Sequence, residues 1–291
     1  MRESMTVNDA ADRWVADCVA RNLKPQSLKK YRQLSELLKS AWGGLQVGSL
    51  KVDDVRAFRE RWKLSPLTTV KRLESIRGFF NFCVSSGWIE KNPAKLVKSP
   101  VVRQVPTLPF SDDEMKTLLW AVDTIREIHP QIPEITEQKL RAIVLLILHT
   151  GMRISDVVLL NLERIKDGKL LIYTQKTGTP VSCPLPKIVL DALEACDEGD
   201  PYYFWSGSGK VKSMITEWQE RMKKACVIAG IPDGHFHRLR DTFSVRLLEK
   251  GVPLETVAAL LGNTVQVCQK HYAPWVKSRN DALEEAVKGT W

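Results

Sequence analysis

The sequence predicts a mainly α-helical protein in two parts: an N-terminal four-helix domain and a C-terminal α-rich domain with a small β-hairpin or sheet. Three observations lead to this fold class. Apolar residues recur at helical spacing along most of the chain, a proline-rich stretch interrupts that pattern near residue 100, and one short region has the pattern of paired strands. With 291 residues, 44% of them hydrophobic, the chain is long enough for two domains with their own cores.

Four helices are expected in the first third of the chain. Pro25 and Pro66 stand where proline favours a helix start, and Gly87 stands where the last helix stops. Four helices with short loops make a compact bundle. The expected spans are 7–21, from 25 to the glycines at 43 and 44, from about 52 to 62, and from 65 to about 86.

A stretch with three prolines and no helical period covers residues 98–110. Proline fixes the backbone, so this stretch is expected to be an extended, semi-rigid linker. We therefore place an N-terminal domain at residues 1–99, the linker at 100–110 and a C-terminal domain at 111–291.

The second domain is expected to be mostly helical. Ser111 and Glu114 form a capping-box pattern at its start. Two short strands are predicted at 170–174 and 180–184, with Gly178 in the turn between them. The predicted helices are about 111–122, 134–150, 154–160, 187–195, 211–229, 238–250, 254–261 and 280–287.

The net charge of +9 is concentrated in the first third of the chain. Residues 1–99 hold 19 basic and 10 acidic side chains, and the rest of the chain is balanced. A basic helical module indicates a polyanionic partner such as DNA, although a solvated surface gives the same count. The basic residues of the helix faces proposed to contact DNA are Lys29, Lys30, Arg32, Lys71, Arg72 and Arg77.

The remaining composition points to a cytoplasmic protein without a metal site. The six cysteines are scattered with no C-x-x-C pair, which favours reduced thiols over a zinc site or a disulfide framework. No apolar run is long enough to cross a bilayer, and the N-terminus does not have the layout of a signal peptide, so no membrane association is expected.

Four short segments carry the chemistry of phosphodiester cleavage. A tyrosine is a nucleophile for phosphorus once its phenol, with an ordinary pKa near 10, loses its proton. Arginines clamp the non-bridging oxygens, and a lysine or histidine protonates the leaving oxygen. The segments are Thr150–Asp156, Lys176–Gly178, His237–Arg240, and Leu261–Asn263 followed by Tyr272.

In order and spacing these segments resemble the catalytic motifs of the tyrosine recombinase family, which includes phage integrases and Xer-type recombinases. Tyr272 lies nine residues after Asn263, the usual family spacing. Residues 69–80 and 87–93 also resemble the family's core-binding (SAM-like) domain. The catalytic residues that the resemblance assigns are Arg153, Lys176, His237, Arg240, Asn263 and Tyr272, with Asp156 in support.

The resemblance implies a DNA strand-transfer reaction through a 3′-phosphotyrosine, without a cofactor or a metal. In this mechanism Lys176 protonates the 5′ oxygen, and His237 assists proton transfer or binds the phosphate. It also implies double-stranded DNA as partner and a homotetramer on two duplexes. Residues 276–291 are a candidate for the segment exchanged between subunits; the same apolar residues equally fit packing within their own subunit.

Two positions depart from the family pattern. Asn263 stands where the family usually has histidine or tryptophan; it can donate a hydrogen bond but cannot carry a titrating proton. If that position only stabilises charge, activity survives with a loss of roughly ten- to a thousand-fold. Asp241 stands where a second histidine is common, and pairing with Arg240 or another cation is the interpretation available from sequence.

Two other functions remain open at this point. Each motif residue taken singly fits a surface charge or a packing role. A type IB topoisomerase shares the chemistry but reseals the same strand, and the N-terminal helical bundle argues against it. A non-catalytic DNA-binding protein derived from a recombinase is supported only by Asn263. No added arm-binding domain is evident, so a simple two-domain recombinase is expected.

Overall fold

The computed structural model describes residues 4–102, 108–196, 201–272, 285, 287 and 288. The chain divides into two compact units, Met1–Val105 and Pro106–Trp291. This division falls within the stretch that the sequence predicts as a linker. The two units are described separately below.

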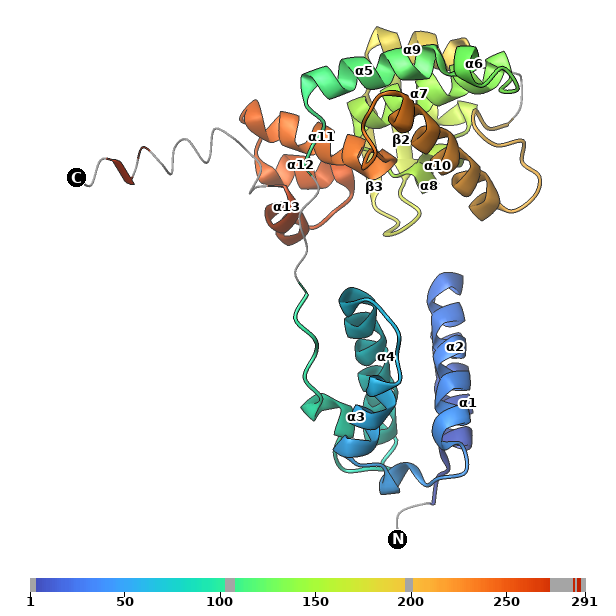
Figure 1. Ribbon diagram of the computed structural model, residues 1–291, viewed down its shortest axis with the longest axis vertical. Coiled ribbons are helices and arrows are strands. Elements are labelled where there is room, and N and C mark those ends of the chain that lie inside the picture. Colours follow the sequence, from blue (N-terminus) through green and yellow to red (C-terminus); the bar gives the residue numbers. More distant parts are fainter. Residues whose placement is uncertain (1–3, 103–107, 197–200, 273–284, 286, 289–291) are drawn as a thin grey trace. The chain divides into compact units, whose positions relative to one another are not determined.

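The N-terminal unit is a helical bundle. Figure 1 shows α1 and α2 packed side by side. The side chains of Thr6 and Ser65 cap α1 and α4 by accepting hydrogen bonds from backbone N–H groups three residues ahead, as N-cap residues commonly do. The elements are α1 (Val7–Ala20), α2 (Pro25–Trp42), η1 (Val47–Ser49), α3 (Val52–Glu60), α4 (Pro66–Ser85) and η2 (Pro93–Leu96).

Aromatic side chains form the centre of this bundle. Trp14 of α1 meets Phe79 of α4 edge-on with ring centroids 5.6 Å apart, and Phe79 meets Phe80 at 5.2 Å. Phe79 and Phe80 are completely buried. Edge-to-face pairs of this kind add to the free energy gained by burying their area. The apolar stripes read from the sequence therefore meet in one core.

The C-terminal unit is built around one buried helix, α7 (Glu134–Thr150). Every residue from Ala142 to Leu148 is buried, so this helix is covered on all sides. Helices α5, α9 and α11 pack against it (Figure 1). The other helices are α5 (Asp112–Asp123), α6 (Ile125–Ile128), α8 (Ile154–Val158), η3 (Leu162–Arg164), α9 (Lys187–Glu194), α10 (Val211–Ile228), α11 (Phe236–Glu249), α12 (Leu254–Leu261) and α13 (Val265–His271).

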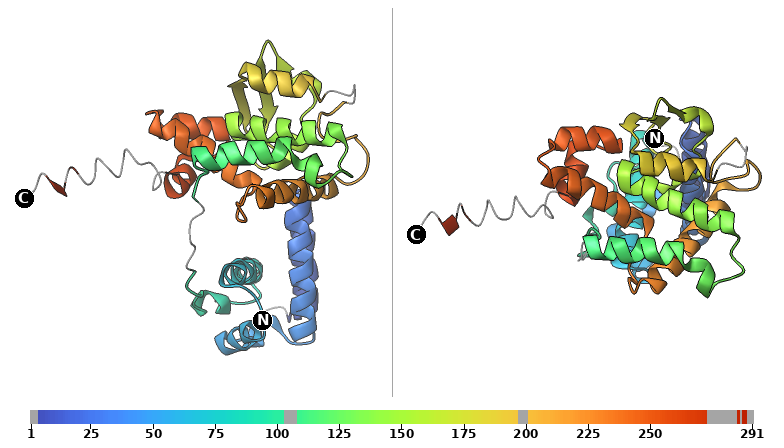
Figure 2. Two further views of the ribbon diagram at one scale, coloured as in Figure 1. Left: turned by 45° about the horizontal axis from the view of Figure 1, so that its top comes forward. Right: turned by 90° about the horizontal axis from the view of Figure 1, so that it is seen from above.

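A three-stranded antiparallel sheet in the order β1-β2-β3 lies at one edge of this unit (Figure 2, left). The strands are β1 (Ile165–Lys166), β2 (Lys169–Tyr173) and β3 (Pro180–Pro184). Leu170 pairs with Cys183 and Ile172 with Val181, and all four side chains are buried while their neighbours face outward. This alternation confirms the predicted hairpin; β1 is too short to have a pattern of its own.

The mainly α fold class is confirmed, with differences in individual elements. Helix α13 and the single turn α6 were not predicted from the sequence. Helix α11 begins two residues earlier than predicted because His235 caps it: its Nδ1 accepts the N–H of Arg238 at 3.0 Å. The helix predicted at 280–287 falls largely outside the described residues.

Gly151 ends α7 in a conformation that suits glycine. Its φ is +66°, in the left-handed region. A Cβ at this position would also lie 2.6 Å from side-chain atoms of both Leu261 and Phe243. The backbone therefore turns sharply here, in direct contact with α11 and α12.

Replacing Gly151 with alanine is expected to lower the free energy of unfolding of the C-terminal unit by about 2–4 kcal/mol. The left-handed backbone and the overpacking against Leu261 and Phe243 each contribute. Gly178→Ala is the matched control, since its φ is +71° but no heavy atom lies within 4 Å of its Cβ position; its cost is expected to be about 1 kcal/mol. Guanidinium unfolding measures both, and equal losses would contradict the packing argument.

Candidate active site

Arg240 is the most deeply buried charge of the site. Its side chain is 2% exposed, and its guanidinium donates to the carbonyl oxygens of Gly151 and, at 2.9 Å, Leu261. These carbonyls lie at the C-terminal ends of α7 and α12, where helix dipoles concentrate negative charge. Gly262, like Gly151, ends its helix with a positive φ. Two helix ends thus hold one buried cation.

Arg153 lies beside Arg240, at the N-cap of α8 just after the Gly151 turn. Its Nη2 donates to Oδ1 of Asn263 at 2.5 Å. Burial, and then the charge of Arg240, lower the pKa of Arg153, while the charges of Asp156 and Tyr272 oppose this. The guanidinium stays protonated, because an arginine side chain keeps its charge under all physiological conditions.

Two buried N–H donors of this pair point to an anion. Nη1 of Arg153 and Nε of Arg240 are buried and have no hydrogen-bond partner among the described residues. Such unpaired buried donors cost free energy in the folded protein. Arginine donors match the oxygens of a phosphate, so a phosphate between the two arginines would satisfy them.

The phenol of Tyr272 lies in contact with Arg240. Tyr272 follows α13 directly, and its backbone N–H donates to the carbonyl of Cys268 at 2.9 Å. Tyr272 is 3% exposed, and its phenol lies close enough to the Arg240 guanidinium for the two groups to interact. Burial raises the pKa of Tyr272, and the charge of Arg240 offsets part of that rise. The sequence-predicted nucleophile and arginine therefore meet within one chain.

Asp156 and Lys176 lie on the side of the site next to the sheet. The buried carboxylate of Asp156 accepts the backbone N–H of Gln175 at 2.8 Å, at the start of the β2–β3 turn. Burial raises the pKa of Asp156, and this hydrogen bond and the charge of Arg153 oppose the rise. Lys176 is the next residue and is exposed. Asp156 thus supports the lysine turn.

His237 lies in the first turn of α11, at the opening of the site. Desolvation of its ring and then the charge of Arg240 lower the pKa of His237 to about 4. Since 63% of the side chain is exposed, water screens part of this effect. The imidazole is neutral at neutral pH with or without that screening.

A cavity of about 450 Å³ opens between α8, α10 and α11. Arg153 and His237 line it together with apolar atoms of Met152, Met222 and Phe236. The site therefore has an entrance large enough for part of a nucleotide.

Hydrogen bonds to Ala258 and Arg153 hold Asn263 in place. Its backbone N–H donates to the carbonyl of Ala258 at 2.9 Å and its Oδ1 accepts from Arg153. Burial raises the pKa of the Cys268 thiol, and a hydrogen bond from the Asn263 side chain partly offsets this. In this arrangement Asn263 orients an arginine, a role that does not need a titrating proton.

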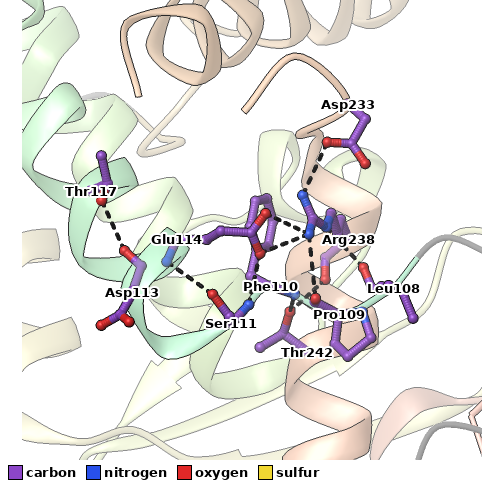
Figure 3. A network of polar contacts seen from close by, with 10 residues as sticks. All are labelled: Leu108, Pro109, Phe110, Ser111, Asp113, Glu114, Thr117, Asp233, Arg238 and Thr242. Atoms are coloured by element: carbon purple, nitrogen blue, oxygen red, sulfur yellow. Dashed lines mark hydrogen bonds and ion pairs between the residues drawn. The ribbon is translucent and has the colours of Figure 1, made fainter. Parts of the chain in front are cut away.

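Arg238 is a positioning residue that sequence reasoning missed. Figure 3 shows its guanidinium at the centre of a polar network between α11 and the segment before α5. It donates to Glu114 at 2.8 Å and to the carbonyl of Leu108 at 2.8 Å, and it lies 4.2 Å from the ring centroid of Phe110. Thr242 adds a bond from the Phe110 N–H.

One face of α11 thus serves the site and another anchors the start of the domain. The sequence signal connected with this role was Glu114, which belongs to the predicted capping box at the start of α5. That pattern does not indicate which basic residue pairs with Glu114.

The basic residues predicted to contact DNA lie on α2 and α4 of the N-terminal unit. Lys29, Lys30, Arg32 and Lys71 are exposed, while Arg72 is half-buried over the ring of Trp62. Lys30, Lys71 and Arg72 line one cavity of about 420 Å³ between the two helices.

Arg77 differs from the other five. It donates to the carbonyls of Ala94 and Val97 at 3.2 and 2.7 Å and so ties η2 to α4. Its guanidinium therefore makes hydrogen bonds within the N-terminal unit.

The part of the chain that the structure describes contains no disulfide and no cluster of metal-binding side chains. All six cysteines are buried free thiols. Among the described residues, no group of three or more His, Cys, Asp or Glu side chains is arranged to hold a metal. None of the described helices is long and apolar enough to cross a membrane.

Comparison with known proteins identifies the family. Residues 110–274, more than half of the chain, match the model of the phage integrase family. The chain belongs to this family of tyrosine recombinases. The matched region runs from Phe110, beneath Arg238, to just beyond Tyr272, and it contains every catalytic residue predicted from the sequence.

Curated relatives are tyrosine recombinases. XerC of Chlamydia muridarum is 26% identical over 213 residues, which cover 69% of this chain and 64% of that protein. XerC of Vibrio parahaemolyticus is 26% identical over 258 residues, covering 84% of this chain and 78% of that protein. The alignment with the chlamydial proteins thus spans less than two thirds of their length.

Solved structures show the same fold. A lambda integrase dimer bound to a COC′ core site superposes with a TM-score of 0.73 at 18% identity, covering 93% of this chain and 78% of that one. The Tn1549 transposon integrase in complex with a circular intermediate DNA gives 0.71 at 18% identity, covering 92% and 95%. At this identity the likeness concerns the fold.

Arg238→Ala is expected to lower the free energy of unfolding of the C-terminal unit by about 3 kcal/mol, because it removes a buried ion pair and two carbonyl contacts. Arg246→Ala is the matched control on the same helix, since Arg246 pairs with the exposed Asp112. Its expected loss is below about 1 kcal/mol. Thermal or guanidinium unfolding compares the two variants. Equal stabilities would refute the anchoring role of Arg238.

Proposed function

We propose that this chain is a site-specific recombinase that cleaves and rejoins DNA through a 3′-phosphotyrosine at Tyr272. The observation that carries the proposal is the meeting of the Tyr272 phenol with Arg240, beside Arg153, where two buried arginine donors lack partners among the described residues. A phosphate bound there lies next to the phenol oxygen. Membership of the phage integrase family supports the same reaction.

In the proposed first step the Tyr272 oxygen attacks phosphorus and the bond to the 5′ oxygen breaks. Arg153 and Arg240 neutralise the charge that grows on the non-bridging oxygens, with Asn263 orienting Arg153. Lys176, on the turn held by Asp156, gives a proton to the leaving 5′ oxygen. His237 is neutral at neutral pH and hydrogen-bonds to the phosphate.

In the second step a 5′-hydroxyl of the partner strand attacks the phosphotyrosine and releases Tyr272. One phosphodiester forms for each one broken, so the protein's own residues suffice to complete the exchange.

The proposed partners are double-stranded DNA and further copies of this chain. A solved lambda integrase is a tetramer bound to a Holliday junction, and we propose a tetramer on two duplexes for this chain as well. The segment 276–291, proposed to exchange between subunits, lies outside the described residues except for 285, 287 and 288.

A nicked suicide substrate, whose cleaved end diffuses away, tests the proposal directly. Wild-type protein on its cognate site is expected to form a covalent protein–DNA adduct visible on a denaturing gel, and Tyr272→Phe is expected to form none because the nucleophilic oxygen is missing. Tyr173→Phe is the matched control, an exposed tyrosine on β2 that is expected to leave adduct formation unchanged.

The outcomes separate the alternative functions. Specific DNA binding without an adduct from the wild type would favour a non-catalytic DNA-binding protein. Relaxation of supercoiled plasmid without exchange between two sites would favour a topoisomerase. An adduct that survives Tyr272→Phe would refute the assignment of the nucleophile.

The basic face of α2 and α4 is expected to contribute DNA affinity. Changing Lys30 and Lys71 to alanine should weaken binding to all DNA sequences and lower the slope of log affinity against log salt by about 0.9 per lost phosphate contact. Arg21→Ala and Arg56→Ala are controls, since both arginines already pair with carboxylates of their own helices. Fluorescence anisotropy at several salt concentrations gives the slopes, and identical slopes would exclude phosphate contacts at this face.

A further inference from the structure

Asp241, one of the two positions where this sequence departs from the family pattern, lies close to the proposed nucleophile. It follows Arg240 on α11, and its side chain is 15% exposed. Its carboxylate lies close to the phenol of Tyr272, and the interaction with that phenol lowers the pKa of Asp241. Of these two groups only the phenol can donate a proton, because an ionised carboxylate can only accept. Asp241 is therefore a nearby acceptor for the proton that Tyr272 must lose to become a nucleophile.

His237 lies close to the same carboxylate. Its Nε2 is 3.6 Å from Oδ1 of Asp241, one helical turn apart on α11. That distance is within ion-pair range but longer than a hydrogen bond. The carboxylate thus interacts with both the phenol and the imidazole, and Asp241, not His237, influences the pKa of the Tyr272 phenol.

The charges around Asp241 come from three elements. Burial raises the pKa of Asp241 to about 6, and the charge of Arg240 and the interaction with Tyr272 limit the rise. A base with a pKa nearer to neutrality is better matched to the phenol than an ordinary carboxylate. The titratable and charged groups near the Asp241–Tyr272–His237 cluster are Arg240 on α11, His235 at its N-cap, Arg153 before α8, and Cys268 and His271 on α13.

We propose that Asp241 is the general base that accepts the proton of Tyr272 during DNA cleavage. As the phenol oxygen bonds to phosphorus, its O–H bond breaks and the proton moves to a carboxylate oxygen of Asp241. The P–O bond to the 5′ oxygen breaks, and that oxygen takes its proton from Lys176. In rejoining, Asp241 returns the proton to the departing phenolate. This inference rests on the proposed recombinase function.

The test uses the full-length protein and the nicked suicide substrate, with single-turnover adduct formation measured between pH 5 and 9. For the wild type, the rate is expected to fall tenfold per pH unit below about pH 6, where Asp241 becomes protonated. D241N is expected to lose about a hundred- to ten-thousand-fold in rate and to lack this acid limb. Asparagine still accepts a hydrogen bond from the phenol, so a mere positioning role would leave the rate within tenfold.

Further variants keep the test decisive. D241E is expected to restore the acid limb because it restores a carboxylate, and D113N, which neutralises an exposed carboxylate on α5, is expected to behave as the wild type. Circular dichroism checks folding, and D241S replaces D241N if the latter does not fold. An active D241N with an unchanged pH profile would overturn this assignment alone. Absence of any adduct from the wild type would overturn the proposed function itself.

Discussion

The hydrogen bonds of the Arg240 guanidinium to the ends of α7 and α12 are the constraint on which the rest of the site depends. Removing a cation from water costs several kcal/mol unless oxygens replace the water. Here the replacing oxygens are the carbonyls of Gly151 and Leu261, each at a helix C-terminus. The glycine turns at 151 and 262 let both helices end there, so the chain directions after them are fixed by the same cation.

The positions of the groups proposed to act on a phosphate follow from those two turns. Two residues after Gly151 comes Arg153, and directly after Gly262 comes Asn263, and the two side chains meet at 2.5 Å. Helix α13 then starts, and Tyr272 directly after it lies close to Arg240. Helix α11 contributes Arg240 and Asp241 to the site and uses Arg238 to hold the segment at Leu108. Structural and chemical roles thus alternate along one helix.

Local signals allowed much of this to be predicted from the sequence. Apolar periodicity and helix-start signals such as Pro25 and Ser111 predicted most helices, because helix formation depends on neighbouring residues. Side-chain partners across the fold were not predictable: no local pattern connects Arg238 to Glu114, or Asp241 to Tyr272. The short α13 was missed because seven residues hold too little periodicity. The predicted DNA contacts and catalytic roles remain predictions that the proposed assays test.

The β2–β3 turn touches both walls of the site. On one side the N–H of Gln175 binds Asp156, and on the other the hydroxyl of Thr177 reaches the carbonyl of Gly262 at 3.4 Å. Lys176 lies between these two attachments. The turn that carries Lys176 is therefore attached to the Gly262 turn that precedes α13. The proposed proton donor and the proposed nucleophile are thus linked through this attachment, which favours their joint engagement with a strand over independent movement of either one.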